Sequence, residues 1–561
     1  MRCITTRPGT LTFQGFPRFR SGFLTVSTAG LLWATAVAPG RAVNVQEGNQ
    51  VVINGQPVPG AWALWPDLQS AQPSVGIADS VWMRYLGGDL GDTTSLTQQP
   101  VQWFSSAPTT LSTRLNRNGT ARYLNLTDAA RQWGWQLTPR LGVLDIRTPS
   151  ATVQSVQVGQ QPWGRRLVLT LDRPTPWRLA SLTNSRTGKT DRQFTIQTDA
   201  TLSPTALQGF SMVPGLGLKS LKITPASGRI ALQGTMDGRF QPQIWTLDNP
   251  PRLVVDIRQT PMKSRRIVWA PGLVWREDLV SLGNAQFPVT WLAVNLRQPG
   301  LRLLPLWGGS NALVGIDGLS TMAQRNQAAA AINAGFFSRD RQTTLGAIRR
   351  EGVWVSSPIL NRGVIAWTPQ GQVKVGRLML QEWVATQQGQ TLMIASSNSG
   401  YPQKGMARYT DIWGPTYTPL LKNEQVATVI NNQVQSLQPA PEGTAIPIPR
   451  NGYLLVLRGI PPGPELAPGN QLQYQGRSII PAFEAYPNIM GAGPLLIENG
   501  RIVVDAIAEQ FNPTFAQQSA DRSGIGQTAD GTVLLAATHN RIGGPGPTLG
   551  EWAQIMRQLG A

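Results

Sequence analysis

Residues 521–541 read DRSGIGQTADGTVLLAATHNR, and this stretch shows a pattern that recurs along the chain. A segment ending at Gly526 enters a turn at Asp530 and Gly531, and an apolar run then leads to Thr538. Short apolar runs joined by Asp-Gly or Asn-Gly turns are typical of antiparallel hairpins. The 561 residues include 58 Gly and 44 Pro. This high content of glycine and proline favours many short strands over long helices, so we expect a β-rich protein.

Composition and charge narrow the class of protein further. With 41% hydrophobic residues the chain can build real cores, and its length predicts several domains. Lys and Arg number 49 against 30 acidic residues, which gives a net charge of +19. No dense basic run, zinc-ligand spacing or RNP-like motif accompanies this charge, so we expect no nucleic-acid partner. An acidic glycan or a phosphate-bearing ligand fits the charge, and so does a role in solubility alone.

Residues 1–42 resemble a secretory signal peptide. Arginines precede an uncharged stretch from Ser21 to Ala38, and Ala36 to Ala38 offers an A-x-A cleavage site. The Ser, Thr and Gly content of the stretch favours cleavage over a retained anchor. We therefore expect a periplasmic or secreted protein of the cell envelope, without stable membrane insertion after cleavage. Cys3 lies in this leader and is the only cysteine, which excludes disulfides and cysteine nucleophiles from the mature chain.

Residues 43–150 are predicted to form a small α+β module that binds a ligand or acts as a spacer. An apolar run enters a turn at Asn54 and Gly55, which predicts a hairpin. Helical patterns cover residues 79–86 and a segment that starts near Thr127.

Residues 151–260 are predicted to form a β-sandwich. Short β runs bounded by Gly, Pro, Asn and Asp cover residues 166–171, 193–197 and 229–233, and residues 245–257 close the segment. The segment resembles AMIN domains, sandwich modules that hold bacterial envelope enzymes at peptidoglycan. The resemblance implies a cell-wall glycan as partner, and a sandwich with no ligand of its own is the alternative.

Residues 261–561 are predicted to form one mixed α+β domain. Apolar runs such as 289–294 alternate with occasional helices, one of them over residues 319–327. We expect the hairpins at 346–354 and 526–533 to be equivalent halves of one sheet.

The first segment of this domain that suggests chemistry is residues 328–337. An apolar strand is predicted to stop at Asn333 and to enter a turn at Gly335. Backbone N–H groups freed at such a turn can meet an anionic or hydroxyl-bearing ligand, and Asn333 offers both a donor and an acceptor. An ordinary strand-ending turn is the alternative.

The second segment follows the hairpin quoted above. His539, the only histidine, ends the apolar strand and precedes Arg541, while Arg522 lies on the other strand. The two arginines could form a phosphate clamp through bidentate hydrogen bonds. A lone histidine at a strand end serves a structural role as readily as a functional one.

The third segment runs from Gly491 to Glu509. Asp505 and Glu509 are four residues apart and would share a face if they lay on a helix. Glycoside hydrolysis usually needs two carboxyl groups. Exposed acidic pairs with this spacing are common in proteins that catalyse nothing.

Together these segments resemble the phosphodiester glycosidase family, which includes the enzyme that uncovers mannose 6-phosphate by removing N-acetylglucosamine from a phosphodiester. The resemblance covers about residues 265–561, and the multi-module layout is similar to that of secreted cyanobacterial members. An N-G-G-x-F turn is matched, with Ala334 in place of one Gly, by Asn333, Gly335 and Phe337. A G-x-G-P-L-L segment is matched by Gly491, Gly493, Pro494, Leu495 and Leu496. A hairpin motif, R-S/T-x-x-G-x-x-x-D-G, is matched by Arg522, Ser523, Gly526, Asp530 and Gly531.

The resemblance implies hydrolysis of a sugar-1-phosphodiester. We predict no cofactor, and we assign no residue to a metal site. His539 or Glu509 would move the proton. Groups that would bind the substrate are Asn333, Gly335, Gly491, Gly493, Arg522 and Arg541. The rival hypothesis is a non-catalytic protein that binds cell-wall glycan and stacks sugar rings on Trp163, Trp177 or Trp245.

The end of the chain departs from the family pattern. Thr548 and Glu551 predict a capping box for a helix with an apolar stripe over residues 549–559, and Gly560 can end it. In the family a strand and a D-G-G-G-S segment follow this helix, whereas here the sequence ends at Ala561. We therefore expect an incomplete catalytic domain in which the apolar face of the last helix is uncovered.

Overall fold

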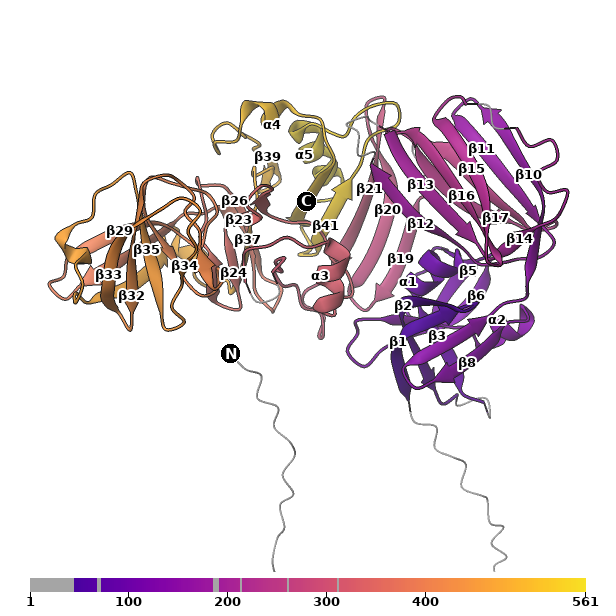
Figure 1. Ribbon diagram of the computed structural model, residues 1–561, viewed down its shortest axis with the longest axis horizontal. Coiled ribbons are helices and arrows are strands. Elements are labelled where there is room, and N and C mark those ends of the chain that lie inside the picture. The colour runs from indigo at the N-terminus through magenta and orange to yellow at the C-terminus, as the bar shows by residue number, and fades with distance from the viewer. Residues whose placement is uncertain (1–44, 68–71, 185–190, 212–213, 260–261, 310–311) are drawn as a thin grey trace, which may run out of the picture. The chain divides into compact units, whose positions relative to one another are not determined.

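The computed structural model describes residues 45–561 except 68–71, 185–190, 212–213, 260–261 and 310–311 (Figure 1). The predicted signal peptide, residues 1–42, lies outside the described residues. Strands dominate the described chain and helices are short, which confirms the predicted β-rich, multi-sheet fold. No helix in these ranges is long and apolar enough to cross a membrane.

The first sheet has nine strands and confirms the predicted N-terminal hairpin and helices. Asn54 and Gly55 have φ values of 46° and 80°, the left-handed pair that a tight hairpin turn requires. The predicted helices are α1 (Asp79–Val81) with the π-turn η1 (Trp82–Leu86), and α2 (Thr127–Gln132). The strands, in sheet order, are β4 (Asp89–Leu90), β5 (Gln98–Gln102), β6 (Thr109–Leu115), β7 (Arg122–Asn125), β3 (Ser74–Ala78), β2 (Gln56–Trp65), β1 (Gln46–Ile53), β9 (Val143–Arg147) and β8 (Gln136–Arg140).

Two further sheets share their buried side chains and form a sandwich. The five-stranded sheet contains, in order, β14 (Ala200–Leu202), β10 (Ala151–Gln161), β11 (Gly164–Leu171), β18 (Arg252–Arg258) and β17 (Gln241–Leu247). The four-stranded sheet contains β12 (Trp177–Asn184), β13 (Asp191–Thr198), β16 (Arg229–Asp237) and β15 (Leu218–Ala226). Core residues of the nine-stranded sheet belong to the same hydrophobic cluster as those of the sandwich. The boundaries at residues 150 and 260 therefore stay predictions.

A five-stranded sheet joins the start of the C-terminal region to its end. Its strands are β19 (Arg265–Ala270), β20 (Leu273–Leu282), β21 (Ala285–Val294), β41 (Val533–Thr538) and β40 (Arg522–Gln527). β21 and β41 pair antiparallel, with Val289 opposite Thr538. This pairing confirms the apolar run at 289–294 as a strand and places the Arg522 hairpin at the edge of the sheet.

The other hairpin lies in a different sheet. That sheet contains β25 (Val353–Ser356), β24 (Ile348–Arg350), β37 (Asn488–Gly491), β26 (Gly363–Trp367) and β27 (Val373–Arg377). β24 pairs with β37, whereas β41 pairs with β21. The expectation that the two hairpins are halves of one sheet is wrong, because each hairpin is completed by a different neighbouring strand.

A seven-stranded sheet and several short elements complete the region. The sheet contains β33 (Gln433–Ala440), β32 (Glu424–Ile430), β35 (Gly452–Arg458), β30 (Gly405–Tyr409), β29 (Thr391–Ser397), β28 (Leu380–Thr386) and β36 (Leu472–Ser478). Three strand pairs are β22 (Phe336–Ser338) with β23 (Thr343–Leu345), β31 (Thr416–Tyr417) with β34 (Ile446–Pro447), and β38 (Ile497–Glu498) with β39 (Arg501–Ile502). The helical elements are α3 (Leu319–Arg325), η2 (Pro464–Leu466), η3 (Pro481–Phe483), α4 (Pro513–Gln517) and α5 (Leu549–Gln558).

One local prediction in this region is wrong, and the helix that would bring two carboxyl groups onto one face is not formed. Residues 328–334 form no strand and are exposed or only partly buried, and β22 begins later, at Phe336. An apolar segment becomes a strand only where a neighbour pairs with it, and no strand pairs with residues 328–334 in the described structure. Residues 506–510 form a turn, so Asp505 and Glu509 do not share a helix face.

The last helix, α5, is covered rather than open. The predicted capping box between Thr548 and Glu551 is present, and Gly560 ends the helix with a φ of 103°. The apolar side chains of α5, including Trp552 and Ile555, are buried against a cluster from β21 and β41. The expectation of an uncovered apolar face is therefore wrong, because these two strands provide the packing surface.

Candidate functional site

The first and third predicted segments meet where β22 begins and β37 ends. Gly335 has a φ of 40°, and a Cβ placed there would lie 3.4 Å from the carbonyl oxygen of Gly491. A Cβ on Gly491 would lie 2.8 Å from the backbone nitrogen of Ala347. Gly493 has a φ of 87°, and a Cβ there would lie 2.7 Å from Glu509 Oε2. Both glycines of the G-x-G-P-L-L segment thus allow approaches that a side chain would block.

Glu509 ties this segment to β26 and β27. Its side chain is buried, and Oε2 accepts a hydrogen bond from the backbone N–H of Gly363 at 2.9 Å. Oε1 accepts from the N–H of Leu495 at 2.9 Å and from Arg377 Nε at 3.1 Å. Asp505 is exposed, and its Oδ1 accepts from the N–H of Ala508. The two carboxylates therefore differ in burial and in hydrogen-bond partners. The hydrogen bonds of Glu509 suit a residue that positions the glycine-rich segment.

Three phenylalanine rings and two arginines continue the site. Phe336, which follows Gly335, packs against Phe511 and Phe515 with ring centroids 5.5 and 5.6 Å away. The Arg362 guanidinium lies 3.8 Å from the centroid of Phe511, and that of Arg522 lies 5.0 Å from the centroid of Phe515. Arg362 and Arg377 were not predicted from the sequence, because no local motif marks either residue. Their position beside Glu509 depends on strands far away along the chain.

Arg522 is a partly desolvated cation. Burial lowers the pKa of its guanidinium. Nη2 donates a hydrogen bond to the carbonyl oxygen of Gln518, while Nε is buried without a hydrogen-bond partner in the described chain. No carboxylate of the described residues forms an ion pair with Arg522, whereas Arg377 pairs with Glu509 at 3.0 Å. A partly buried guanidinium without a counter-ion is a suitable contact for an anionic ligand.

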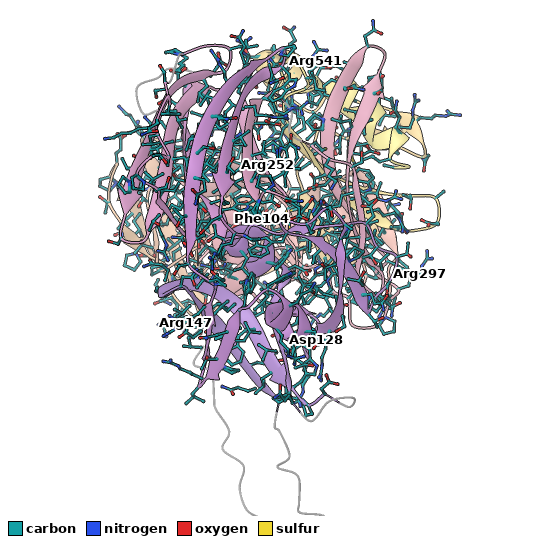
Figure 2. All side chains as sticks on the ribbon, turned by 90° about the vertical axis from the view of Figure 1, so that its right-hand side faces the viewer. Phe104, Asp128, Arg147, Arg252, Arg297 and Arg541 are labelled. Carbon is teal, nitrogen blue, oxygen red and sulfur yellow. The ribbon has the colours of Figure 1, made fainter. Side chains whose placement is uncertain are left out.

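The remaining candidates have other neighbours. His539 directly follows β41 and is exposed, with Nδ1 3.7 Å from Asp521 Oδ2. Arg541 lies in the loop after β41 (Figure 2), and its guanidinium lies 6.0 Å from the centroid of the Phe287 ring. The guanidinium groups of Arg522 and Arg541 thus pack on different rings. Asn333 is exposed just before the Gly335 turn. Within the described ranges, no three His, Cys, Asp or Glu side chains form a group that could hold a metal.

Comparison with known proteins connects part of this site to a family. The model of the phosphodiester glycosidase family matches residues 423–561. The match includes Gly491, Gly493, Glu509 and Arg522, whereas Asn333 and the other residues before position 423 lie outside it.

Similar structures and curated proteins complete the comparison. A crystal structure of a hypothetical protein from Synechocystis shares 40% sequence identity, covers 92% of each chain and superposes with a TM-score of 0.83. A structure of a protein from Burkholderia pseudomallei K96243 shares 16% identity, covers 73% of this chain and 91% of that one, and has a TM-score of 0.40. No curated protein matches the chain.

Proposed function

We propose that the protein hydrolyses a sugar-1-phosphodiester, because the model of the phosphodiester glycosidase family matches residues 423–561. In this reaction the bond between the anomeric carbon and the phosphate oxygen breaks. Water supplies the hydroxyl group of the released sugar, and its proton goes to the phosphate oxygen. The products are a free sugar and a phosphate monoester.

The observation that carries this proposal is the environment of Arg522. Its guanidinium is partly desolvated, packs on Phe515 and has no carboxylate partner among the described residues. A phosphodiester has one negative charge and two free oxygens, which a guanidinium can contact through two parallel hydrogen bonds. Such a contact would compensate the cation and fix the phosphate close to the glycine-rich segment.

The two candidates for proton transfer differ in accessibility. Glu509 is buried, and both of its oxygens accept hydrogen bonds. His539 is exposed and follows Thr538, which lies opposite Arg522 in the hairpin. The proposal therefore assigns proton transfer to His539 and positioning of the glycine-rich segment to Glu509.

The test uses the full chain and a sugar-1-phosphate alkyl diester, with release of reducing sugar as the readout. Arg522→Ala should lower kcat/KM by about 100-fold, the usual effect of losing a charge-stabilising contact. The matched control is Arg501→Ala, which removes an exposed arginine of the same domain and should leave activity unchanged. Thermal melts of both variants show whether they are folded. Absence of hydrolysis by the unaltered chain would overturn the proposal, and full activity of folded Arg522→Ala would remove Arg522 from it.

We also propose that the protein is exported to the cell envelope. The support is the leader pattern of residues 1–42 and a mature sequence without cysteine. Sequencing of the mature N-terminus from an envelope fraction should begin at or near Pro39 or Val43. A cytosolic protein that begins at Met1 would contradict this part of the proposal.

A further inference from the structure

The seven-stranded sheet has one face that turns away from its core. In β28 the residues Glu382, Val384 and Thr386 are buried, whereas the residues that alternate with them are partly exposed. β29 and β36, the neighbours of β28 on either side, alternate in the same way and expose every second residue of this face. The three strands thus present one continuous surface. We call it the outer face, and the residues that matter here are Met379, Trp383, Met393, Arg477 and Ile479.

Apolar side chains of the outer face lie in two adjoining groups. Trp383 lies opposite Met393, which is 52% exposed. Met379 and Ile479 continue β28 and β36 beyond the ends of these strands, and the Ile479 N–H donates to the Met379 carbonyl oxygen at 3.1 Å. These two residues are 45% and 53% exposed, and Ile480 beside them is 40% exposed. Exposed apolar side chains that lie together are a feature of interaction surfaces.

The loop that carries Ile479 and Ile480 is held by its own hydrogen bonds. Ser478 Oγ donates to the carbonyl oxygen of Ile480 at 2.7 Å and accepts from the Ile480 N–H at 3.2 Å. The Glu484 carboxylate accepts from the Ser478 N–H. Because the loop is already fixed, little conformational entropy is lost when its side chains meet a partner.

Arg477 lies between the two apolar groups. It is exposed and lies opposite Gln381, whose Oε1 accepts hydrogen bonds from its Nη2 and Nε at 3.1 and 3.3 Å. The guanidinium also lies 5.8 Å from the centroid of the Trp383 ring. A neutral amide and an aromatic ring hold this cation in place, and neither neutralises its charge.

The outer face carries positive charge without acidic partners. Lys404 is exposed and directly precedes β30, the strand beside β29. No carboxylate of the described residues forms an ion pair with Lys404 or Arg477, and Glu484 lies 3.9 Å from Arg349 instead. The strands β28, β29, β30 and β36 contain one acid, Glu382, and it is 2% exposed. The field of this face is therefore positive.

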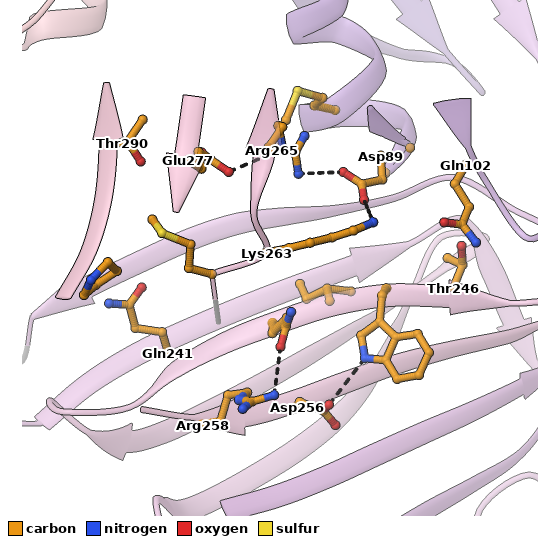
Figure 3. Close-up of a pocket in the computed structure, with 18 of the residues that line it drawn as sticks. Asp89, Gln102, Gln241, Thr246, Asp256, Arg258, Lys263, Arg265, Glu277 and Thr290 are labelled. Atoms are coloured by element: carbon orange, nitrogen blue, oxygen red, sulfur yellow. Dashed lines mark hydrogen bonds and ion pairs between the residues drawn. The ribbon is translucent and has the colours of Figure 1, made fainter. Parts of the chain in front are cut away.

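Two cations in a cleft of about 710 Å³ show the opposite arrangement (Figure 3). The cleft is lined by His539, by Glu277 and by residues of the sandwich. In it Arg265 Nη2 lies 2.8 Å from Asp89 Oδ1, and Lys263 Nζ lies 3.3 Å from the other oxygen of Asp89. These two cations are compensated by a carboxylate, whereas those of the outer face are not.

We propose that the outer face binds reversibly to the surface of an anionic lipid bilayer. The exposed methionines and isoleucines enter the boundary between headgroups and acyl chains, and the Trp383 indole lies at the level of the headgroups. Arg477 and Lys404 contact lipid phosphates, which supply the anions that the protein does not. The proposal goes beyond the hydrolase function, since none of these residues belongs to the Arg522 cluster.

A lipid surface fits the outer face better than a folded protein partner does. A stable protein interface takes about 20–30 residues from each side, whereas the apolar groups described above contain only a few side chains. Peripheral binding to a bilayer depends on buried apolar area together with attraction to anionic lipids. A bilayer also needs no complementary shape and is negative over its whole surface.

Co-sedimentation of the full chain with lipid vesicles tests the proposal. One set of vesicles contains equal parts of phosphatidylcholine and phosphatidylglycerol, and the comparison set contains phosphatidylcholine alone. We expect binding to the anionic vesicles that weakens as salt rises, because salt screens the charges. Ile479→Ser and Arg477→Gln should each weaken this binding about fivefold, the usual contribution of one half-buried apolar side chain or of one cation at a lipid surface.

The matched controls are Leu141→Ser and Arg501→Gln, which remove an exposed apolar side chain and an exposed arginine from other parts of the chain. Both should bind within about twofold of the unaltered chain, because neither residue lies on the outer face. Residues 1–42 are the same in every form, so differences between the variants report on the outer face. Thermal melts show whether each variant is folded.

Four outcomes would overturn the proposal. They are no binding to the anionic vesicles, equal binding to the neutral ones, equal binding by the two test variants and the controls, and a dimer in solution that Ile479→Ser dissociates, which would assign the face to a second copy. Arg522→Ala should leave vesicle binding unchanged, and Ile479→Ser should leave hydrolysis of a soluble diester unchanged. Failure of the hydrolase proposal and failure of the lipid proposal are therefore distinguishable.

Discussion

Replacing Glu509 by glutamine distinguishes a positioning residue from a proton donor. The buried carboxylate accepts hydrogen bonds from the N–H groups of Gly363 and Leu495 and from Arg377. A carboxamide has nearly the same shape, but one of its two ends is a donor. In Glu509→Gln, therefore, at least one of these N–H groups faces another donor, and Arg377 loses its anionic partner.

The expected loss of stability follows from these contacts. A buried donor left without a partner costs about 1–3 kcal/mol, and a hydrogen bond to a charged group contributes about 1.5–3 kcal/mol. Arg377 is 30% exposed and so regains part of its hydration, which favours the lower end of the combined range. We expect Glu509→Gln to lower the free energy of unfolding by about 3 kcal/mol.

Urea unfolding followed by tryptophan fluorescence measures this loss, and kcat on the phosphodiester measures the functional effect. The matched control is Glu442→Gln, because Glu442 is 71% exposed and pairs with Lys422 only at 3.9 Å. An exposed pair of this kind contributes about 0–1 kcal/mol, so the control should unfold close to the unaltered protein.

One result would contradict a positioning role for Glu509. If Glu509→Gln retained full stability but lost hydrolysis, Glu509 would be a proton donor or acceptor and not a residue that positions the glycine-rich segment. Reduced stability together with a proportionate, partial loss of activity is the expected pattern.

Three further predictions concern stability. Gly493→Ala should lower the free energy of unfolding by about 3 kcal/mol, since φ is 87° and the new Cβ would lie 2.7 Å from a carboxylate oxygen of Glu509. Gly335→Ala should lower it by only about 1 kcal/mol, because its Cβ would lie 3.4 Å from the nearest atom. Equal losses in urea unfolding would contradict this difference. Glu424→Ala should lower the free energy of unfolding by about 3–5 kcal/mol, because it removes the carboxylate that lies 2.7 Å from the buried Arg458 guanidinium. A loss below about 1 kcal/mol in thermal unfolding would contradict this prediction. Burial raises the pKa of Tyr453 to about 12. The unfolded chain therefore loses this proton first, and stability present below about pH 10 should fall between about pH 10 and 12, by less in Tyr453→Phe; an identical decline in the variant would refute the assignment.

Local patterns predicted the elements that local interactions determine. The Asn54 and Gly55 turn depends on two residues that accept positive φ, and the capping box of Thr548 and Glu551 depends on four consecutive positions. Both are present, as is the hairpin that carries Arg522. These features are independent of which distant strand lies beside them.

The features that could not be predicted from the sequence depend on contacts between segments that lie far apart along the chain. Residues 328–334 are apolar enough for a strand, but the structure places no strand beside them, and composition alone does not reveal this. The same holds for Glu509, whose burial depends on partners at positions 363, 377 and 495. The cleft likewise combines Asp89, Lys263 and Glu277 from separate segments. A sequence shows the residue types at such sites but not which of them meet.

The glycine-rich segment shows how motif and fold complement each other. In the sequence, Gly491 and Gly493 belong to the G-x-G-P-L-L segment and are predicted to bind the substrate. In the structure, Gly491 lets the segment approach Ala347, and Gly493 lets it approach the carboxylate of Glu509. The two glycines and the buried acid thus form one unit that fixes the backbone between β37 and the phenylalanine cluster. A site that binds a phosphate with a single arginine needs such rigidity, because a guanidinium selects its ligand by geometry as well as by charge.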